Sequence, residues 1–411
     1  MNKKIIGNAP ENVKSEIIEF LKTFQEGYTK RDISVIDSFM EKLFDKEQDI
    51  VAVGTSNGEW ILNFDEAKDL VQSDWQWWGD FSINIDDVII SYSDDIVWIT
   101  TSGTVKYSYD NTEETYSRWL TTMEDYFKED RNYDKSSMKT DLLHINWMLN
   151  HKLHDWGKEK REYLSPIRFT AVVTKSQGRF VFKQMQFSLP APSYPDVRID
   201  NKNMKIEILE DTKKKLREFK QNRTVESADE IRRVLEGFQK DYLDSSNIRL
   251  NELTQKYFAP GDYAHFIDTK NYMAMGLEEI KKLILSHQEK WDTISIDIDE
   301  AIIGQHENTA WVLTGGYLKK TMNEEEALKR QIDNIKRIYY KEASPKEKLF
   351  EIRENISLAL KEIEKGNEYI WPFRLEGVLL KHNGSWKFDY MQFSFPFYYI
   401  LEGLRDEVLL D

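Results

Sequence analysis

The hexapeptide MQFSLP at Met185–Pro190 returns 206 residues later as MQFSFP at Met391–Pro396. A near-identity over six residues at this distance indicates an internal repeat, and a repeated domain decides the architecture of a chain. If the hexapeptide is a strand, its Gln and Ser side chains share one face and its Met and Phe side chains share the other. Either face could line a cavity.

The residues before each hexapeptide extend the repeat. They read RFTAVVTKSQGRFVFKQ from Arg168 and RLEGVLLKHNGSWKFDY from Arg374. A Gln-Gly or Asn-Gly pair separates two runs rich in β-branched and aromatic residues, and Asn-Gly favours the tight turn of a β-hairpin. Each copy is therefore predicted to end in a hairpin whose last strand is the hexapeptide.

Two further blocks repeat. SDWQWWGDFSINIDDVIISYSDDIVWITTSGT from Ser73 pairs without a gap with SHQEKWDTISIDIDEAIIGQHENTAWVLTGGY from Ser286, which matches Gly103 with Gly316. The alternation of apolar and polar residues in this block predicts paired strands. Nearer the start of each copy, apolar residues at spacings of four, three and four predict a helix with one buried face. The matched helix positions are Ile17, Leu21, Phe24, Gln25 and Tyr28 in one copy and Ile231, Leu235, Phe238, Gln239 and Tyr242 in the other.

These blocks predict two α+β domains, at residues 1–195 and 226–411, joined by a linker at 196–225. The linker stretch DTKKKLREFKQNR is highly charged and is expected to form a solvated helix or a tether. Polar insertions at 111–165 and 319–371 interrupt both copies, so the insertion is expected to predate the duplication. Their helical periodicity rests on Leu142, Ile145, Met148, Leu149 and Leu153 in one copy and on Ile332, Ile335, Ile338 and Tyr339 in the other.

The composition narrows the class of protein. The chain carries 57 basic and 72 acidic side chains, a net charge of −15, which disfavours nucleic acid and anionic membranes as partners. It contains no cysteine, which excludes disulfides, thiolate catalysis and cysteine-bound zinc. No apolar run reaches the length of a membrane span or a signal peptide, so we expect a soluble, cytoplasmic protein.

The order of these elements resembles the NTF2-like superfamily and, within it, the SnoaL-like group. Three motifs carry the resemblance: AVGTSNGEW at Ala52–Trp60, the strands IVWITTSG and TAWVLTGG, and the closing strand GRFVFKQMQFSLP. The resemblance implies two cones, each a curved antiparallel sheet packed on helices around a pocket. It also implies sheet-to-sheet dimerisation, which a tandem could make within one chain as an intramolecular pseudo-dimer. The family hosts both enzymes and binding modules, so the fold alone does not give the function.

The sequence departs from the family pattern at two places. The closing strand often carries a His where Gln186 and Gln392 stand, and Gln cannot shuttle a proton near neutral pH. The second copy lacks the GTxxGEW segment and places Tyr272 opposite Glu59. We therefore expect any chemistry in the first copy, with the second copy in a structural role.

Asp74 and Trp78 form the main candidate site. They lie four residues apart at the end of a predicted helix, so they share one face if the helix extends that far. A carboxylate beside an indole is a way to raise the pKa of an acid, which suits a general base in a pocket. The alternative is a packed Trp with a solvated Asp. The second copy has His287 and Trp291 at these positions.

Other candidates are open to two interpretations. Glu59 and Trp60 precede the third helix, where Glu59 is either a pocket acid or a helix-entry acid. Arg168 and Arg374 begin the penultimate strands, where each either clamps a ligand carboxylate or makes a structural ion pair. Gln186 and Gln392 are candidate ligand contacts on the closing strands.

We expect no metal and no cofactor. His144, His151 and His154 fall on one broad face of a predicted helix, but no HExxH motif accompanies them, which favours a surface or interface stripe. Phosphate-binding loops, dinucleotide fingerprints and nucleophile elbows are missing from the sequence.

Three functions remain. The first is a module that binds a small, largely apolar or carboxylate ligand in one or both cones. The second is an isomerase or hydratase with Asp74 or Glu59 as general base. The third is a scaffold with filled cones that forms an internal pseudo-dimer.

Overall fold

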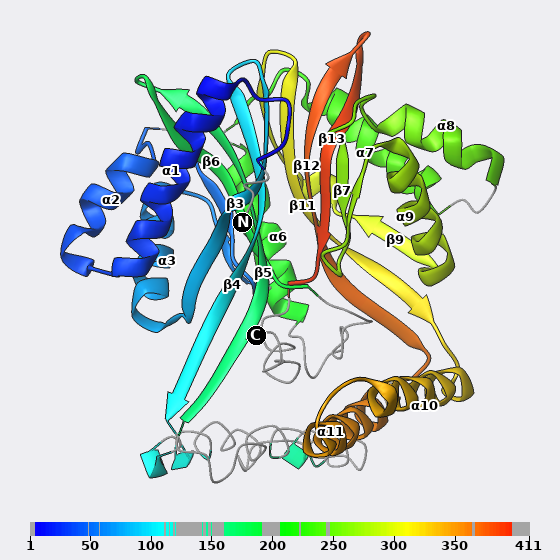
Figure 1. Ribbon diagram of the computed structural model, residues 1–411. Coiled ribbons are helices and arrows are strands. Elements are labelled where there is room, and N and C mark those ends of the chain that lie inside the picture. The colour runs from blue at the N-terminus through cyan, green and yellow to red at the C-terminus, as the bar shows by residue number, and fades with distance from the viewer. Residues whose placement is uncertain are drawn as a thin grey trace.

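The computed structural model describes residues 5–47, 49–56, 58–110, 160–190, 206–221, 223–243, 247–363 and 366–396, with scattered residues between 112 and 149. Within them the chain forms two similar α+β units, each a largely antiparallel curved sheet with helices packed on one face (Figure 1). This confirms the predicted fold class and the tandem duplication. The histidine cluster His144, His151 and His154 lies outside the described residues.

The first unit contains a six-stranded sheet in the order β2-β1-β6-β5-β4-β3. All its pairings are antiparallel except that of β1 with β6, which is parallel. The strands are β1 (Val51–Val53), β2 (Trp60–Ile61), β3 (Asp80–Ser93), β4 (Ile96–Asp110), β5 (Lys160–Ser176) and β6 (Arg179–Ser188).

The second unit repeats this order as β8-β7-β13-β12-β11-β10, with β9 also paired to β11. The single strand β3 of the first unit corresponds to β9 and β10 of the second, which a short 3-10 turn at Ile298–Glu300 separates. The strands are β7 (His265–Ile267), β8 (Met273–Met275), β9 (Thr293–Ile296), β10 (Ile302–His306), β11 (Thr309–Thr321), β12 (Glu368–His382) and β13 (Ser385–Ser394).

The helices of the two units also correspond. The first unit has α1 (Glu11–Lys30), α2 (Ile36–Leu43) and α3 (Phe64–Trp77), and the second has α7 (Ala228–Tyr242), α8 (Asn247–Tyr257) and α9 (Leu277–Lys290). The predicted apolar faces of α1 and α7 are buried. In the first unit, Gln25 of α1 accepts a hydrogen bond from the Ile83 backbone N–H at 2.8 Å. In the second unit, Gln239 of α7 accepts one from the Ile296 backbone N–H at 2.5 Å. The repeated Gln thus ties each first helix to its sheet.

Both final hairpins have the expected tight turn. Gln177 and Asn383 have positive φ angles of 51° and 49°, and Gly178 and Gly384 follow at 80° each. Two successive residues with positive φ define the turn type that matches the twist of antiparallel strands. The prediction from the Gln-Gly and Asn-Gly pairs is confirmed.

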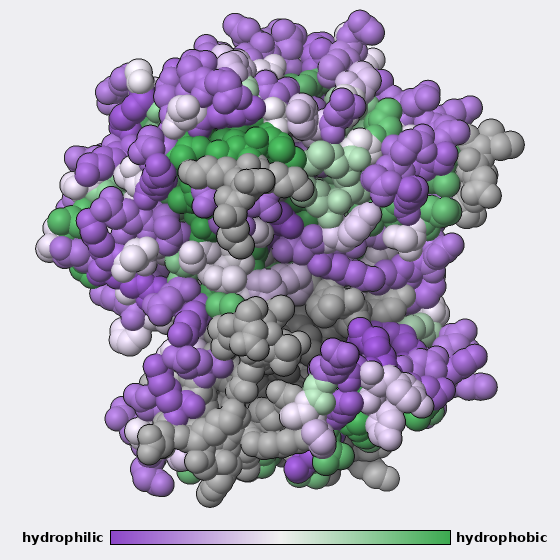
Figure 2. Space-filling view, in the orientation of Figure 1, coloured by the Kyte–Doolittle hydropathy of each residue, from purple (hydrophilic) through white to green (hydrophobic). Residues whose placement is uncertain are grey.

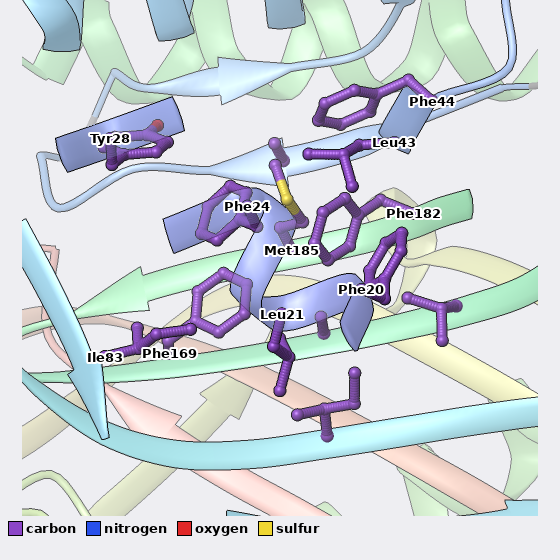
Figure 3. Close-up of a cluster of buried hydrophobic side chains, with 14 of the residues drawn as sticks. Phe20, Leu21, Phe24, Tyr28, Leu43, Phe44, Ile83, Phe169, Phe182 and Met185 are labelled. Carbon is purple, nitrogen blue, oxygen red and sulfur yellow. The ribbon is translucent and has the colours of Figure 1, made fainter. Parts of the chain in front are cut away.

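Aromatic rings fill the interior of the first unit (Figure 3). Phe24 lies at its centre, with ring centroids 5.2 Å from Phe169 and 5.4 Å from Phe182. Met185 and Phe187 of the repeated hexapeptide belong to this core. The hydrophobic face of the closing strand therefore points into its own unit.

The linker helix differs from expectation. Residues Ile206–Gln221 form α6, whose Leu216 is buried in a cluster with Trp60 of the first unit and Leu313 of the second. Lys215 pairs with Glu66 (2.8 Å) and Arg217 with Glu300 (2.6 Å). The helix is charged but not simply solvated, because one face packs between the two units.

The second insertion is helical, as its periodicity predicts. It forms α10 (Glu324–Tyr340) and α11 (Pro345–Ile363), at the far end of the long β11–β12 pair (Figure 1). In the first insertion Leu142, Ile145 and Leu149 are helical, whereas Met148 and Leu153 lie outside the described residues.

Figure 2 shows a largely hydrophilic face with hydrophobic patches between the hydrophilic residues. Among the residues that the structure describes, no helix combines the length and the apolar character needed to cross a membrane.

The repeated glycines Gly103 and Gly316 mark a close approach of two strands. A Cβ on Gly316 would overlap the carbonyl oxygen of Ser295, and one on Gly103 would overlap that of Ser82. At the neighbouring Gly315, a Cβ would meet the Asp297 carboxylate at 3.3 Å and the Phe373 carbonyl oxygen at an ordinary contact distance of 3.9 Å. Backbone cannot move aside as a side chain can, so the matched positions Gly103 and Gly316 require Gly, whereas Gly315 does not.

We expect Gly316→Ala to lower the unfolding free energy by about 2–4 kcal/mol. Gly315→Ala, its neighbour on the same strand, should cost less than about 1 kcal/mol. Thermal unfolding of both variants measures the difference, since 1 kcal/mol corresponds to about 2–4 °C for a domain of this size. Equal losses in the two variants would contradict the close-approach explanation.

Candidate functional site

Asp74 lies in the last turn of α3 and faces α1. The hydroxyl of Tyr28 donates a hydrogen bond to Asp74 Oδ2 at 2.8 Å. Helix α3 begins at a defined position because Asn63 accepts a hydrogen bond from the Glu66 backbone N–H. The capped helix and the buried face of α1 thus bring together two polar groups that lie 46 residues apart in the sequence.

Aromatic rings surround this pair. Trp78 stacks on Phe81 with centroids 5.3 Å apart, and its edge meets Phe187 at 5.7 Å. Trp78 and Asp74 are partly exposed, whereas Phe81 and Phe187 are buried. Arg31 donates a hydrogen bond to the Trp78 carbonyl oxygen at 2.9 Å, which fixes the end of the helix. The Tyr28 ring lies 5.1 Å from that of Phe81, so these rings form a rim that reaches the Asp74 carboxyl group through Tyr28.

Burial raises the pKa of Asp74 to about 7, and the hydrogen bond from Tyr28 opposes this shift. The negative charge of Glu59 raises the pKa of Asp74 further. Burial also raises the pKa of Tyr28, with a contribution from Asp74. Asp74 therefore changes its protonation state near neutral pH, as a general acid or base requires.

Glu59 lies in the turn between β1 and β2. Its Oε2 accepts a hydrogen bond from the Ser56 backbone N–H at 2.8 Å. The helix-entry contact belongs instead to Glu66, which accepts from the Leu62 backbone N–H at 2.9 Å. Glu59 acts on Asp74 through its charge.

At the corresponding position, the second unit has three polar side chains in a row: Tyr242, His287 and Asp268. The Tyr242 hydroxyl lies 2.5 Å from His287 Nδ1, and His287 Nε2 lies 3.8 Å from Asp268 Oδ2. Burial lowers the pKa of His287, and Asp268 opposes this shift. His287 and Trp291 are only 4% and 3% exposed, so the second rim is closed where the first is partly open.

Sequence reasoning missed Tyr28, Tyr242 and Asp268 as polar partners. Both tyrosines fall on the apolar stripe that the sequence predicts for the first helix of each unit, and the hydroxyl at the end of each ring gives no separate signal in the sequence. Lys290 was also missed. Burial lowers the pKa of Lys290 to about 7, and its Nζ lies 4.4 Å from the centroid of the Trp291 ring.

The polar residues of the hexapeptide lie between the two sheets. Gln186 Nε2 donates to Ser394 Oγ at 2.9 Å, and Gln392 Nε2 donates to Ser188 Oγ at 2.7 Å. The two bonds are reciprocal, because each Gln of one copy meets the Ser of the other. All four side chains are buried. The repeated Gln and Ser therefore join the two units.

Two arginines make corresponding contacts. Arg168 Nε donates to Asn271 Oδ1 at 3.0 Å, in the loop between β7 and β8. Arg374 donates to the carbonyl oxygens of Gly54 and Ser56, in the equivalent loop of the first unit. Burial lowers the pKa of Arg374 to about 10, and the charge of Glu59 opposes this shift. Each arginine thus reaches across to the other unit.

The centre of this contact is not symmetric. Glu376 occupies the position that Thr170 holds in the first copy, and the Thr170 hydroxyl donates to Glu376 Oε2 at 2.5 Å. Gln184 and Tyr390 donate to the same carboxyl group at 2.8 and 2.9 Å. Burial raises the pKa of Glu376, and the three donors oppose this shift.

Five expected ligand contacts therefore lie outside the cone interiors. Arg168, Gln186, Arg374 and Gln392 lie on the sheet face that meets the other unit. Trp60 packs there too, with the Arg374 guanidinium 5.5 Å from its ring centroid. The physical reason is the period of the strand: Met and Phe of the hexapeptide occupy the interior, so Gln and Ser point the other way.

Comparisons with known proteins add the following. Residues 17–124 match the SnoaL-like domain family. Among curated proteins, none matches the chain.

Similar solved structures include an NTF2-like superfamily protein from Salmonella enterica subsp. enterica serovar Typhimurium str. LT2 (12% identity, 41% of this chain and 91% of that chain, TM-score 0.28). Another is named a putative dehydratase from the NTF2-like family from Streptomyces avermitilis (9% identity, 41% and 95%, TM-score 0.26). A third is named a putative scytalone dehydratase from Novosphingobium aromaticivorans DSM 12444 (8% identity, 44% and 85%, TM-score 0.27). These names describe those proteins only.

The raised pKa of Asp74 makes the stability depend on pH. Between about pH 4, the usual pKa of an unfolded Asp, and pH 7, the unfolded chain releases the Asp74 proton before the folded chain does. The unfolding free energy of the wild type should therefore fall with rising pH by up to about 4 kcal/mol relative to Asp74→Asn, then level off above pH 8.

Urea unfolding from pH 4 to pH 8 measures this difference. Asp69→Asn, which alters an exposed carboxyl on the same helix, is the matched control. A constant difference between wild type and Asp74→Asn would contradict the shifted pKa.

The reciprocal bonds between the units can be tested by a double-mutant cycle. We expect Gln186→Ala and Ser394→Ala to be coupled by about 1 kcal/mol in unfolding free energy, because they share one buried hydrogen bond. Gln186→Ala combined with Ser188→Ala provides the control, since these two side chains bond to different partners. Additive effects in the first pair would argue against the bond.

Proposed function

We propose that this chain, a tandem of two NTF2-like domains whose first copy matches the SnoaL-like family over residues 17–124, binds a small, largely apolar ligand in its first domain. The ligand would lie at the rim formed by Trp78 and Phe81, with a polar group toward Asp74. The second domain would serve as a structural partner. The two copies would form an intramolecular pseudo-dimer through their sheets.

The observation that carries this proposal is the difference between the two rims. Trp78 and Asp74 are partly exposed, whereas their counterparts Trp291 and His287 are buried. The two copies share one fold, so this difference reflects the residues at the rim and not the architecture. Small-molecule sites are lined mainly by apolar and aromatic side chains with a few polar groups, and the partly exposed Trp78 ring with Asp74 fits this pattern.

The filled interior supports a ligand at the rim instead of deep in the cone. Phe24, Phe169 and Phe182 are almost fully buried and pack on one another below the rim. A ligand would therefore contact Trp78 first, and the hydroxyl or carbonyl of that ligand would meet the Asp74 carboxyl group. Neutral Asp74 can donate a hydrogen bond, and ionised Asp74 can accept one.

A second candidate is acid–base catalysis of the isomerase or hydratase type. It is favoured by the pKa of about 7 at Asp74 and by the hydrogen bond from Tyr28. A carboxyl group in this range can take a proton from one carbon of a substrate and return it to another position. In this reading Glu59 would adjust the pKa of Asp74, and Tyr28 would position its carboxylate.

A third candidate is a scaffold without a ligand. The reciprocal Gln–Ser bonds and the packed interiors support it. The scaffold and the binding module share the same contact between units and differ only in whether the first rim is occupied.

The proposal predicts selective stabilisation by a ligand. A thermal-shift screen with sterols, polyketide-like aromatics, fatty acids and small carboxylates should yield a compound that raises the Tm of the wild type. Trp78→Ala should remove the shift, and Trp291→Ala should retain it. Asp74→Asn, tested for turnover of the same compound, separates an enzyme from a binding module.

Two outcomes would count against the proposal. A shift lost in Trp291→Ala and kept in Trp78→Ala would move the site to the second domain. No shift with any compound would favour the scaffold.

A further inference from the structure

A pocket of about 400 Å³ opens on the second unit, away from its rim. It lies between α7, α8 and the turn that joins β12 to β13. Its walls include Glu230, Arg233, Val234, Tyr257, Ser385 and Trp386. Two aromatic rings therefore face a hollow that ends at the C-terminus of a helix.

The first unit fills the corresponding place with an arginine. Arg179 is the counterpart of Ser385 in the repeat, and its guanidinium donates to the carbonyl oxygens of Lys42 (3.1 Å) and Phe44 (3.2 Å) at the end of α2. The corresponding carbonyls of the second unit belong to Lys256 and Phe258 at the end of α8. A serine side chain is too short to reach them.

A second substitution enlarges the hollow. Phe20 of the first unit packs on Phe182 with ring centroids 4.6 Å apart, and the repeat places Val234 at its position. Val is smaller than Phe, so the wall recedes where the ring would lie. The second copy therefore lacks both the guanidinium and the ring that close this place in the first copy.

The rest of the wall is retained in both copies. Lys175 lies 3.3 Å from Glu16 and 4.9 Å from the Phe180 ring centroid. In the second copy Lys381 lies 3.2 Å from Glu230 and 5.3 Å from the Trp386 ring centroid. The pocket is thus surrounded by contacts that both copies share, and it lies where the second copy lacks the arginine and phenylalanine side chains of the first.

We propose that this pocket binds a guanidinium group carried on a short apolar chain, in the place that Arg179 fills in the first copy. The carbonyl end of α8 is the negative end of the helix dipole and attracts cations, and Lys387 Nζ already donates to its Gln255 carbonyl oxygen at 2.5 Å. Trp386 and Tyr257 line the pocket beside the place of an apolar stem, and Lys381 and Lys256 already lie 5.3 and 4.8 Å from their ring centroids. Glu230, whose carboxylate also accepts from Trp386 Nε1 at 2.8 Å, adds negative charge to the wall.

The cations already in the wall have partners. Lys256 pairs with Asp241 at 2.8 Å, and Tyr257 donates to the same carboxylate at 2.8 Å. Arg233 is exposed at the edge, where its Nε donates to the Asp229 carbonyl oxygen at 3.2 Å. The ligand guanidinium belongs either to a free small molecule or to an arginine side chain of a peptide, and both use the same contacts.

Isothermal titration calorimetry of the full chain with N-butylguanidinium tests the proposal. We expect saturable one-to-one binding to the wild type and at least tenfold weaker binding to Ser385→Arg, which restores the residue of the first copy and occupies the pocket. Ser385→Ala, which leaves the hollow open, should bind within about twofold of wild type. A Gly-Arg-Gly peptide that binds tenfold more tightly than N-butylguanidinium would identify the peptide source, and the reverse order the free small molecule.

Three results would overturn the proposal. These are a lack of saturable binding, equal binding to Ser385→Arg, and tighter binding of butyrate than of N-butylguanidinium, which would assign the pocket to anions through Arg233. If Ser385→Arg fails to fold, Val234→Phe fills the same hollow from α7 and must weaken binding in its place.

Discussion

The alternation of side chains along the closing strand is the constraint on which the rest of this molecule depends. In each copy, one face of the strand supplies Met and Phe to the interior of its own unit. The other face supplies Gln and Ser to the contact with the other unit. A strand with both faces buried has no freedom in its register, because a shift by one residue would exchange the two sets. The need to fill the interior on one face and to bond with the other unit on the other face explains why the hexapeptide is repeated.

Much of the fold follows from the sequence, and the reason is local. The hairpins depend on turn pairs such as Asn383 and Gly384, and the first helices depend on a regular apolar face. Local signals cannot say which face of a strand meets a neighbour when both faces are buried. Gln186 and Arg168 were therefore assigned to a ligand, although the bonding partners that explain them lie about 200 and 100 residues away.

The sequence predicts only part of the candidate site, because local spacing indicates neighbours along the chain but not contacts between distant helices. Helix α3 ends at Trp77, and Trp78 follows it in an extended conformation with its backbone N–H donating to the Asp74 carbonyl oxygen at 3.0 Å. The spacing therefore predicts that the two residues lie close together, but not that the helix ends between them. The hydrogen bond from Tyr28 depends on how α1 crosses α3, and no spacing reports that crossing. Likewise, α6 is charged along most of its length, and only its packing reveals that Leu216 is buried between the units.

The unequal pair Thr170 and Glu376 has a consequence for how the two domains pair. Two identical subunits that pair by a twofold axis place equal residues opposite each other. A second domain paired with its own copy would bring two buried carboxyl groups together, where like charges are strongly unfavourable. The first domain supplies a hydroxyl instead. The contact therefore favours pairing of the two different domains over self-pairing of the second.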